Sequence, residues 1–129
     1  MVKLLVIDDD LTVCDFLRCF FSQRGYRVFI AADGKQAVFI VKEKRPDIIL
    51  LDIKMPGPSG IEILQRIRGI DKNSKVIMMS AVNEKIVIEL TAKYGAVGYI
   101  TKPFSLEKLE QEVFLRCDKN TGYWKAGNN

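Results

Sequence analysis

The chain has 129 residues, of which 48% are hydrophobic and 28% are charged. This length suits one well-cored domain, and the composition is ordinary for a globular protein, so disorder throughout the chain is excluded. The formal net charge of +4 comes from scattered basic residues, which indicate a solvated surface rather than a nucleic-acid-binding domain. There is no histidine, which excludes Ser-His-Asp and Cys-His catalysis and histidine metal sites.

No stretch of the sequence indicates export or membrane insertion. The apolar run from Leu4 to Ile7 is too short for a signal peptide, and no later stretch is long enough to span a membrane. Cys14, Cys19 and Cys117 are odd in number and lack C-x-x-C spacing, which favours small core residues over disulfides or a zinc site. We therefore expect a cytoplasmic protein in a reducing compartment.

Strand and helix patterns alternate along the chain. Short apolar runs predict strands, and apolar residues at helical spacing predict helices between them. The first helix has so wide an apolar stripe that we expect it to be largely covered, and Gly25 is placed to end it. Strands are expected at residues 3–7, 27–31, 48–51, 75–79 and 98–101, and helices at about 11–24, 34–44, 60–70, 84–94 and after Ser105.

This alternation predicts an α/β domain with a parallel sheet and right-handed crossovers. The domain is expected to occupy residues 1–117. Residues 118–129 are polar, which is typical of a tail or of the start of a linker to an output domain.

Asp52, directly after the third predicted strand, is the carboxylate that says most about function. Ile48 to Leu51 show no polar alternation, so they predict a strand buried on both faces, and Asp52 follows directly. The segment Met55-Pro56-Gly57-Pro58 cannot continue a strand, so the chain must turn just past Asp52. Open α/β sheets bind ligands at the carboxyl ends of their strands. This stretch alone does not decide between two roles for Asp52: a functional carboxylate, or an aspartate that only caps the turn.

Polar side chains directly follow four of the predicted strands. Because parallel strands present their carboxyl ends at one edge, we expect five residues to converge: Asp8, Asp9, Asp52, Ser80 and Lys102. Clustered carboxylates repel one another unless a hard cation neutralises them, and Mg²⁺ prefers oxygen ligands. A lysine and a hydroxyl beside such a cation would stabilise a phosphoryl group in transfer, with Asp52 as the nucleophile. Asp10 is expected to cap the following helix rather than to bind metal.

Four motifs occur in order along the chain: Val6-Ile7-Asp8-Asp9, Leu51-Asp52-Ile53-Lys54-Met55-Pro56-Gly57, Met79-Ser80-Ala81 and Gly98-Tyr99-Ile100-Thr101-Lys102-Pro103-Phe104. With these motifs the chain resembles the receiver domain of bacterial two-component response regulators over essentially residues 2–117. The resemblance implies a flavodoxin-like three-layer sandwich, in which five helices flank a five-stranded parallel sheet of order 2-1-3-4-5.

The resemblance also implies roles for the converging acidic residues. Asp52 would accept a phosphoryl group from the phosphohistidine of a sensor histidine kinase or a phosphotransfer protein. Mg²⁺ would be bound by Asp9, Asp52 and the backbone carbonyl of Lys54, with Asp8 acting mostly through water. The chain would then catalyse only its own phosphorylation and dephosphorylation, so we expect it not to be an enzyme in the usual sense.

Further implied roles concern the phosphoryl oxygens and the output surface. Ser80 and Lys102 would hold phosphoryl oxygens, and the Lys102-Pro103 bond is expected to be cis. Tyr99 would swing inward when Ser80 moves toward the phosphate. We expect the surface of the fourth helix, fifth strand and fifth helix, with Ile88 and Tyr99, to bind an output domain, a target protein or a second copy after phosphorylation. The domain itself is expected to bind neither nucleic acid nor membrane.

Three other functions compete with this one. A phosphatase of the haloacid-dehalogenase kind needs an acidic residue two positions after its nucleophile, where this chain has Lys54. An FMN-binding domain needs an anion-accepting loop after the first strand, where Asp8, Asp9 and Asp10 would repel a phosphate. A receiver-like module that interacts without being phosphorylated is the third alternative.

Overall fold

The computed structural model describes residues 1–54 and 59–117. The segment Met55-Pro56-Gly57-Pro58 and residues 118–129, on which the expectations of a turn and of a tail or linker rest, lie outside the described residues. Five strands alternate with five helices in this part of the chain: β1 (Lys3–Ile7), α1 (Leu11–Ser22), β2 (Arg27–Ala31), α2 (Gly34–Lys44), β3 (Ile48–Asp52), α3 (Gly60–Ile70), β4 (Lys75–Ser80), α4 (Lys85–Lys93), β5 (Ala96–Thr101) and α5 (Leu106–Arg116).

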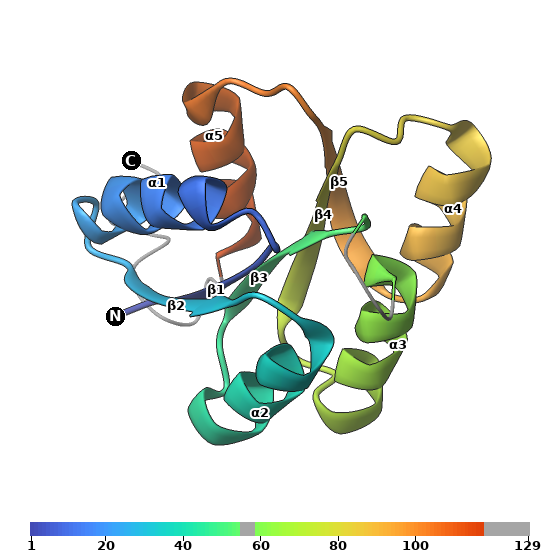
Figure 1. Ribbon diagram of the computed structural model, residues 1–129, viewed down its shortest axis with the longest axis horizontal. Coiled ribbons are helices and arrows are strands. Elements are labelled where there is room, and N and C mark those ends of the chain that lie inside the picture. Colours follow the sequence, from blue (N-terminus) through green and yellow to red (C-terminus); the bar gives the residue numbers. More distant parts are fainter. Residues whose placement is uncertain (55–58, 118–129) are drawn as a thin grey trace.

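The strands form one parallel sheet of order β2-β1-β3-β4-β5, which confirms the expected topology. Helices α1 and α5 cover one face of the sheet, and α2, α3 and α4 cover the other (Figure 1). Most element bounds lie within two residues of those expected from the sequence. The strand β5 begins two residues earlier than expected, at Ala96, where its pairing with β4 is shifted in register between Val76 and Ile77.

The core consists of two apolar clusters separated by the sheet. Side chains alternate across β3, so Ile48 and Leu50 pack with α1 and α5, whereas Ile49 and Leu51 pack with α2 and α3. All four side chains are fully buried, as expected for a central parallel strand. This rigid central strand carries Asp52 to the carboxyl edge of the sheet.

The first helix differs from its expected environment. Cys14, Leu17 and Phe21 of α1 are buried, but Leu11 is 62% exposed and Phe16 is 56% exposed. The expectation that this helix is largely covered was therefore wrong, and Cys19, one of three free cysteines, is exposed rather than in the core. The core covers Cys14, Leu17 and Phe21 fully and Val13 and Phe20 in part, which leaves one side of the wide apolar stripe in solvent.

Helix caps agree with the local sequence. The Asp10 carboxylate accepts hydrogen bonds from the backbone N–H groups of Thr12 and Val13, so Asp10 caps α1 as expected. Ser59 and Ser105 cap α3 and α5 in the same way. Among the described helices, none has the length and apolar character that crossing a membrane requires.

Candidate functional site

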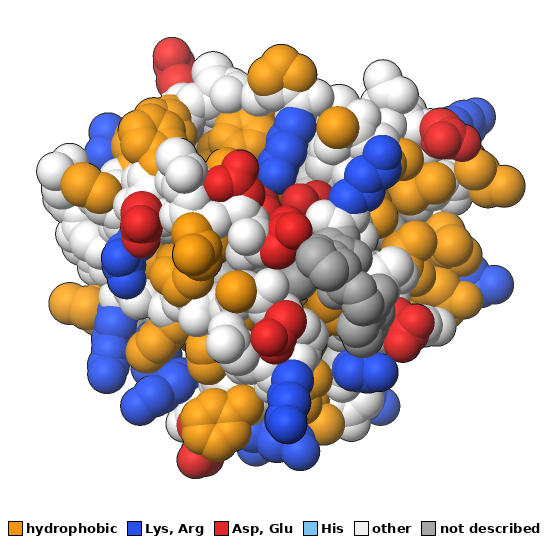
Figure 2. Space-filling view, in the orientation of Figure 1, with side chains coloured by type: hydrophobic (Ala, Val, Ile, Leu, Met, Phe, Trp, Pro, Cys, Tyr) orange, Lys and Arg blue, Asp and Glu red, His pale blue; other side chains and the backbone are white. Residues whose placement is uncertain are grey.

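The carboxyl edge of the sheet brings the expected acidic residues together. One carboxylate oxygen from each of Asp8, Asp9 and Asp52 lies within 4.8 Å of the others. Asp8 and Asp52 are buried, whereas Asp9 is exposed. Acidic side chains gather beside basic ones near the middle of the face drawn in Figure 2, where β1 and β3 end in Figure 1. The donor set is all oxygen, which fits a hard divalent cation such as Mg²⁺ better than a soft metal.

Lys102 connects two of these carboxylates. Its Nζ donates to Asp8 Oδ2 at 2.9 Å and to Asp52 Oδ2 at 3.3 Å. Burial alone would lower the pKa of Lys102, but the hydrogen bond and charge of Asp8 and the charge of Asp52 outweigh burial and raise this pKa. Lys102 therefore stays a cation at neutral pH.

Asp52 is buried and also accepts a hydrogen bond from the backbone N–H of Lys54, at 3.3 Å. Burial raises the pKa of Asp52 above its ordinary value of 3.8; the charge of Lys102 opposes this rise and the charge of Asp8 adds to it. Because burial disfavours the ionised form of Asp52, a cation beside this carboxylate would stabilise it. The side chain of Lys54 is exposed, and its backbone lies next to the phosphoacceptor candidate as the motif implied.

Ser80 ends β4 beside this cluster and is fully buried. Its Oγ accepts a hydrogen bond from the backbone N–H of Val82 at 3.1 Å, and its backbone carbonyl accepts one from the N–H of Lys102 at 2.7 Å. The Lys102-Pro103 peptide bond is cis, as expected. In this structure the hydroxyl of Ser80 is thus bonded to the loop that leads into α4.

The hydroxyl of Tyr99 reaches the same loop from β5. It donates to the backbone carbonyl of Val82, and burial raises the pKa of this tyrosine. Ile88 and Tyr99 both line a small hollow of about 140 Å³ between α4 and β5. Ser80 and Tyr99 therefore bond to the N–H and the carbonyl of one residue, Val82. The Tyr99 contact joins segments that are distant in the sequence, so the sequence did not reveal this shared partner.

Two further residues shape the site without having been assigned to it. The backbone N–H of Gly60 donates to the carbonyl of Ile53 at 2.8 Å, and a Cβ on Gly60 would lie 2.3 Å from the backbone oxygen of Asp52. The thiol of Cys14 donates to the carbonyl of Asp8 at 3.2 Å, and burial raises its pKa to about 11. A glycine directly after a helix-capping serine is the one sequence signal that marks Gly60.

Comparisons with known proteins agree with this geometry. The family model described as "Response regulator receiver domain" matches residues 4–114. The chain is 41% identical over 111 residues to sporulation initiation phosphotransferase F of Bacillus subtilis (strain 168), covering 86% of this chain and 90% of that protein.

Solved structures show the same architecture. A two-component response regulator from Clostridium difficile matches with a TM-score of 0.86 and 26% identity, covering 90% of this chain and 95% of that chain. The CheX-CheY-BeF3-Mg complex from Borrelia burgdorferi matches with a TM-score of 0.84 and 34% identity, covering 88% of this chain and 87% of that chain. With its acidic edge, its topology and a family match over nearly all described residues, this chain belongs to the response regulator receiver domain family.

Proposed function

We propose that this receiver domain accepts a phosphoryl group on Asp52 in a Mg²⁺-dependent reaction. The family acts in two-component phosphorelay signalling, where an aspartate accepts the phosphoryl group. The observation that carries the assignment to Asp52 is its position: it is buried, bonded to Lys102 and within reach of Asp8 and Asp9.

The transfer is a displacement at phosphorus. An Asp52 carboxylate oxygen forms the new P–O bond while the P–N bond to a phosphohistidine breaks, and the electron pair leaves with the imidazole nitrogen. Mg²⁺, held by Asp9, Asp52 and the Lys54 carbonyl with Asp8 acting through water, would neutralise the charge on the phosphoryl oxygens. The side-chain amine of Lys102 would turn from the Asp52 carboxylate to a phosphoryl oxygen while keeping its bond to Asp8.

Ser80 would report the phosphoryl group to the output surface. Its hydroxyl would leave the N–H of Val82 to donate to a phosphoryl oxygen, and the loop would then release or reposition Tyr99, which is bonded to the carbonyl of the same residue. The surface around Ile88 and Tyr99 would then bind an output domain, a target protein or a second copy.

The proposal also covers the context of the domain. A sensor histidine kinase or a phosphotransfer protein is the phosphoryl donor, and the domain catalyses only its own phosphorylation and dephosphorylation. Residues 1–117 form the receiver domain, which the family match over residues 4–114 supports. A cytoplasmic location follows from a kinase donor of this class.

Intact mass spectrometry after incubation with acetyl phosphate tests the assignment. We expect a gain of one phosphoryl group with Mg²⁺, little or none with chelator, and none in Asp52→Asn. Asp15→Asn removes an exposed carboxylate and serves as the matched control, which should be phosphorylated normally. Phosphorylation that persists in Asp52→Asn would contradict the assignment. Failure with both acetyl phosphate and a histidine-kinase donor would favour the unphosphorylated interaction module.

A further inference from the structure

A second candidate site lies at the amino edge of the sheet, the end opposite to Asp52. A hollow of about 410 Å³ is bounded by the end of α3, the start of β4, and the segment from the end of α4 into β5. Its lining includes four basic residues and no carboxylate; the basic residues are Arg68, Lys72, Lys75 and Lys93. Arg68, Lys72 and Lys75 are close to one another in the sequence, and the fold brings Lys93 of α4 beside them.

The side chain of Arg68 lines this hollow and is held in place by hydrogen bonds. Its Nε and Nη2 donate to the carbonyl of Gly95 at 3.3 and 2.9 Å, and its Nη1 donates to the carbonyl of Asp71 at 3.1 Å and to Ser74 Oγ at 3.2 Å. Gly95 has φ of +102°, and a Cβ there would lie 2.7 Å from Arg68 Nε. The guanidinium is therefore fixed in place, and its bonds go to neutral oxygens rather than to a carboxylate.

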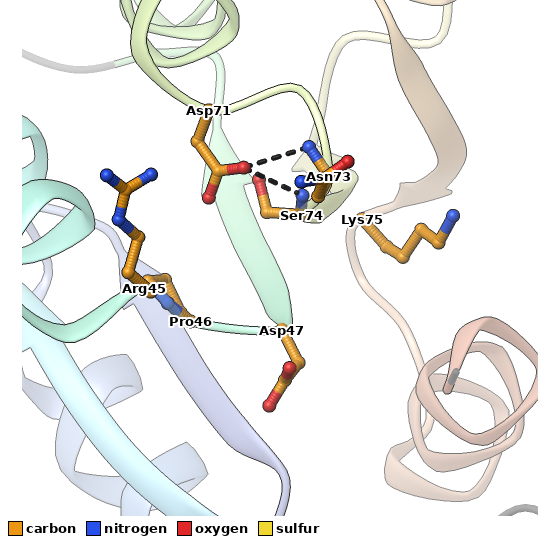
Figure 3. Close-up of a pocket in the computed structure, with 7 residues that line it drawn as sticks. All are labelled: Arg45, Pro46, Asp47, Asp71, Asn73, Ser74 and Lys75. Atoms are coloured by element: carbon orange, nitrogen blue, oxygen red, sulfur yellow. Dashed lines mark hydrogen bonds between the residues drawn. The ribbon is translucent and has the colours of Figure 1, made fainter. Parts of the chain in front are cut away.

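The three lysines of the hollow have no paired carboxylate among the described residues. Within residues 1–54 and 59–117, Lys72, Lys75 and Lys93 make no ion pair. Figure 3 shows Lys75 extending away from Asp71 and Asp47 in the adjoining hollow. The Asp71 carboxylate instead accepts hydrogen bonds from the backbone N–H groups of Asn73 and Ser74, at 2.8 and 3.3 Å.

The positive charge exceeds what the local structure needs. Helices α3 and α4 both end here, and each helix C-terminus carries about half a negative charge, which favours cations such as Arg68 and Lys93. With Asp71 counted as well, these groups offset about two of the four positive charges, leaving an excess of roughly two. The adjoining hollow of Figure 3 has no such excess, because Asp47 and Asp71 line it together with Arg45 and Lys75.

Besides the basic residues, Ser74 and Gly95, the lining contains two side chains with large apolar surfaces, Tyr94 and Val97. Tyr94 is half-buried, and Val97 is 39% exposed on the edge strand β5. A site with excess positive charge on one side and an aromatic and an aliphatic side chain on the other fits an anion that carries an apolar part. The volume lies within the range of about 300–1,000 Å³ that is usual for small-molecule sites.

We propose that this hollow binds a nucleotide with two or more phosphates. Lys72, Lys75 and Lys93 hold the phosphates, while Tyr94 and Val97 contact the base or sugar. Several charges within one small hollow match a polyphosphate chain better than singly charged carboxylates spaced along a peptide. The site is separate from the acidic edge, so the proposal does not depend on phosphorylation of Asp52.

Isothermal titration calorimetry at low salt with EDTA tests this site, using ATP, tripolyphosphate and adenosine. We expect saturable binding of one ATP, weaker binding of tripolyphosphate and none of adenosine. Lys72→Glu/Lys93→Glu should weaken ATP binding by about tenfold or more, because charge-assisted hydrogen bonds are replaced by repulsion. Lys35→Glu/Lys108→Glu changes two exposed lysines elsewhere by the same net charge and should bind ATP like the wild type.

Further variants distinguish binding in this hollow from binding elsewhere on the protein. Lys102→Ala should retain ATP binding, because Lys102 lies at the opposite edge. Lys72→Gln and Lys93→Gln, checked by circular dichroism, replace the double variant if that one does not fold. Absence of ATP binding, equal weakening by both charge-reversed pairs, or loss in Lys102→Ala would overturn the proposal. So would tighter binding of a single-stranded oligonucleotide at the same lysines, which would indicate a nucleic-acid surface.

Discussion

Asp52 shows how one buried carboxylate links function to stability. Its raised pKa means that, between pH 3.8 and that higher value, the folded protein binds more protons than the unfolded chain. The free energy of unfolding therefore decreases as the pH rises through this window, and the ionised carboxylate remains a cost above it. The ionised carboxylate thus lowers the stability of the metal-free protein at the residue that we propose as the phosphoryl acceptor.

We therefore expect Asp52→Asn to stabilise the metal-free protein at pH 7. A gain of about 1 kcal/mol would raise the melting temperature by about 4 °C in a domain of this size, and the gain should disappear below about pH 4. Thermal unfolding with chelator between pH 3.5 and 7.5, followed by circular dichroism, measures this effect. Asp15→Asn, whose carboxylate is in an exposed ion pair with Arg18, should change the melting temperature little. An Asp52→Asn protein that melts below the wild type at pH 7 would contradict the expectation.

At the scale of elements, α3 begins very close to the end of β3, the strand that ends in Asp52. Gly60 is the first residue of α3, and its missing side chain allows the helix to approach the backbone of Asp52 and Ile53. A second glycine of the same helix, Gly69, is exposed, and a Cβ there would have no neighbour within 4 Å. A side chain at position 60 would therefore clash with the backbone of β3, whereas a side chain at position 69 would extend into open space.

Alanine substitutions at Gly60 and Gly69 form a matched pair that tests this difference. Gly60→Ala should destabilise the protein by about 2 kcal/mol or more and slow phosphorylation, because either the helix or the Asp52 backbone must move. Gly69→Ala should stabilise it by about 0.5–1 kcal/mol, since alanine is the better helix former. Urea denaturation of both variants measures the two changes, and a neutral Gly60→Ala would show that the close approach is readily relieved.

At the scale of the whole molecule, the proposed output surface lies far from α2. Ile88 of α4 is half-buried beside Tyr99, whereas Phe39 of α2 is 63% exposed on another part of the molecule (Figure 1). We expect Ile88→Asp to abolish association of phosphorylated copies, seen by light scattering, with unchanged phosphorylation by mass spectrometry. Phe39→Asp should leave both properties unchanged. Association that survives Ile88→Asp would place the output surface elsewhere.

The sequence predicted the sheet order through resemblance and the meeting of Asp8, Asp9, Asp52 and Lys102 through the geometry of parallel strands. It did not predict that Leu11 and Phe16 of α1 are exposed, because periodicity marks apolar faces but not the neighbours that cover them. It also did not reveal the grouping of Lys72, Lys75 and Lys93, which share no helix face or strand end. The sequence therefore predicted the contacts that follow from parallel strands sharing one edge, but not those that depend on how the helices and loops pack around the sheet.

The alternation of β3 side chains between two separate cores limits how this chain can vary during evolution. Deleting one residue within β3 would turn the side chains on one side of the deletion toward the wrong core, or shift the following aspartate out of register with its neighbours. Single-residue insertions and deletions inside the strands should therefore be eliminated by selection, whereas substitutions at the strand ends are tolerated by the fold. Homologues can change their chemistry at this edge by exchanging side chains, but their length differences must accumulate in the loops.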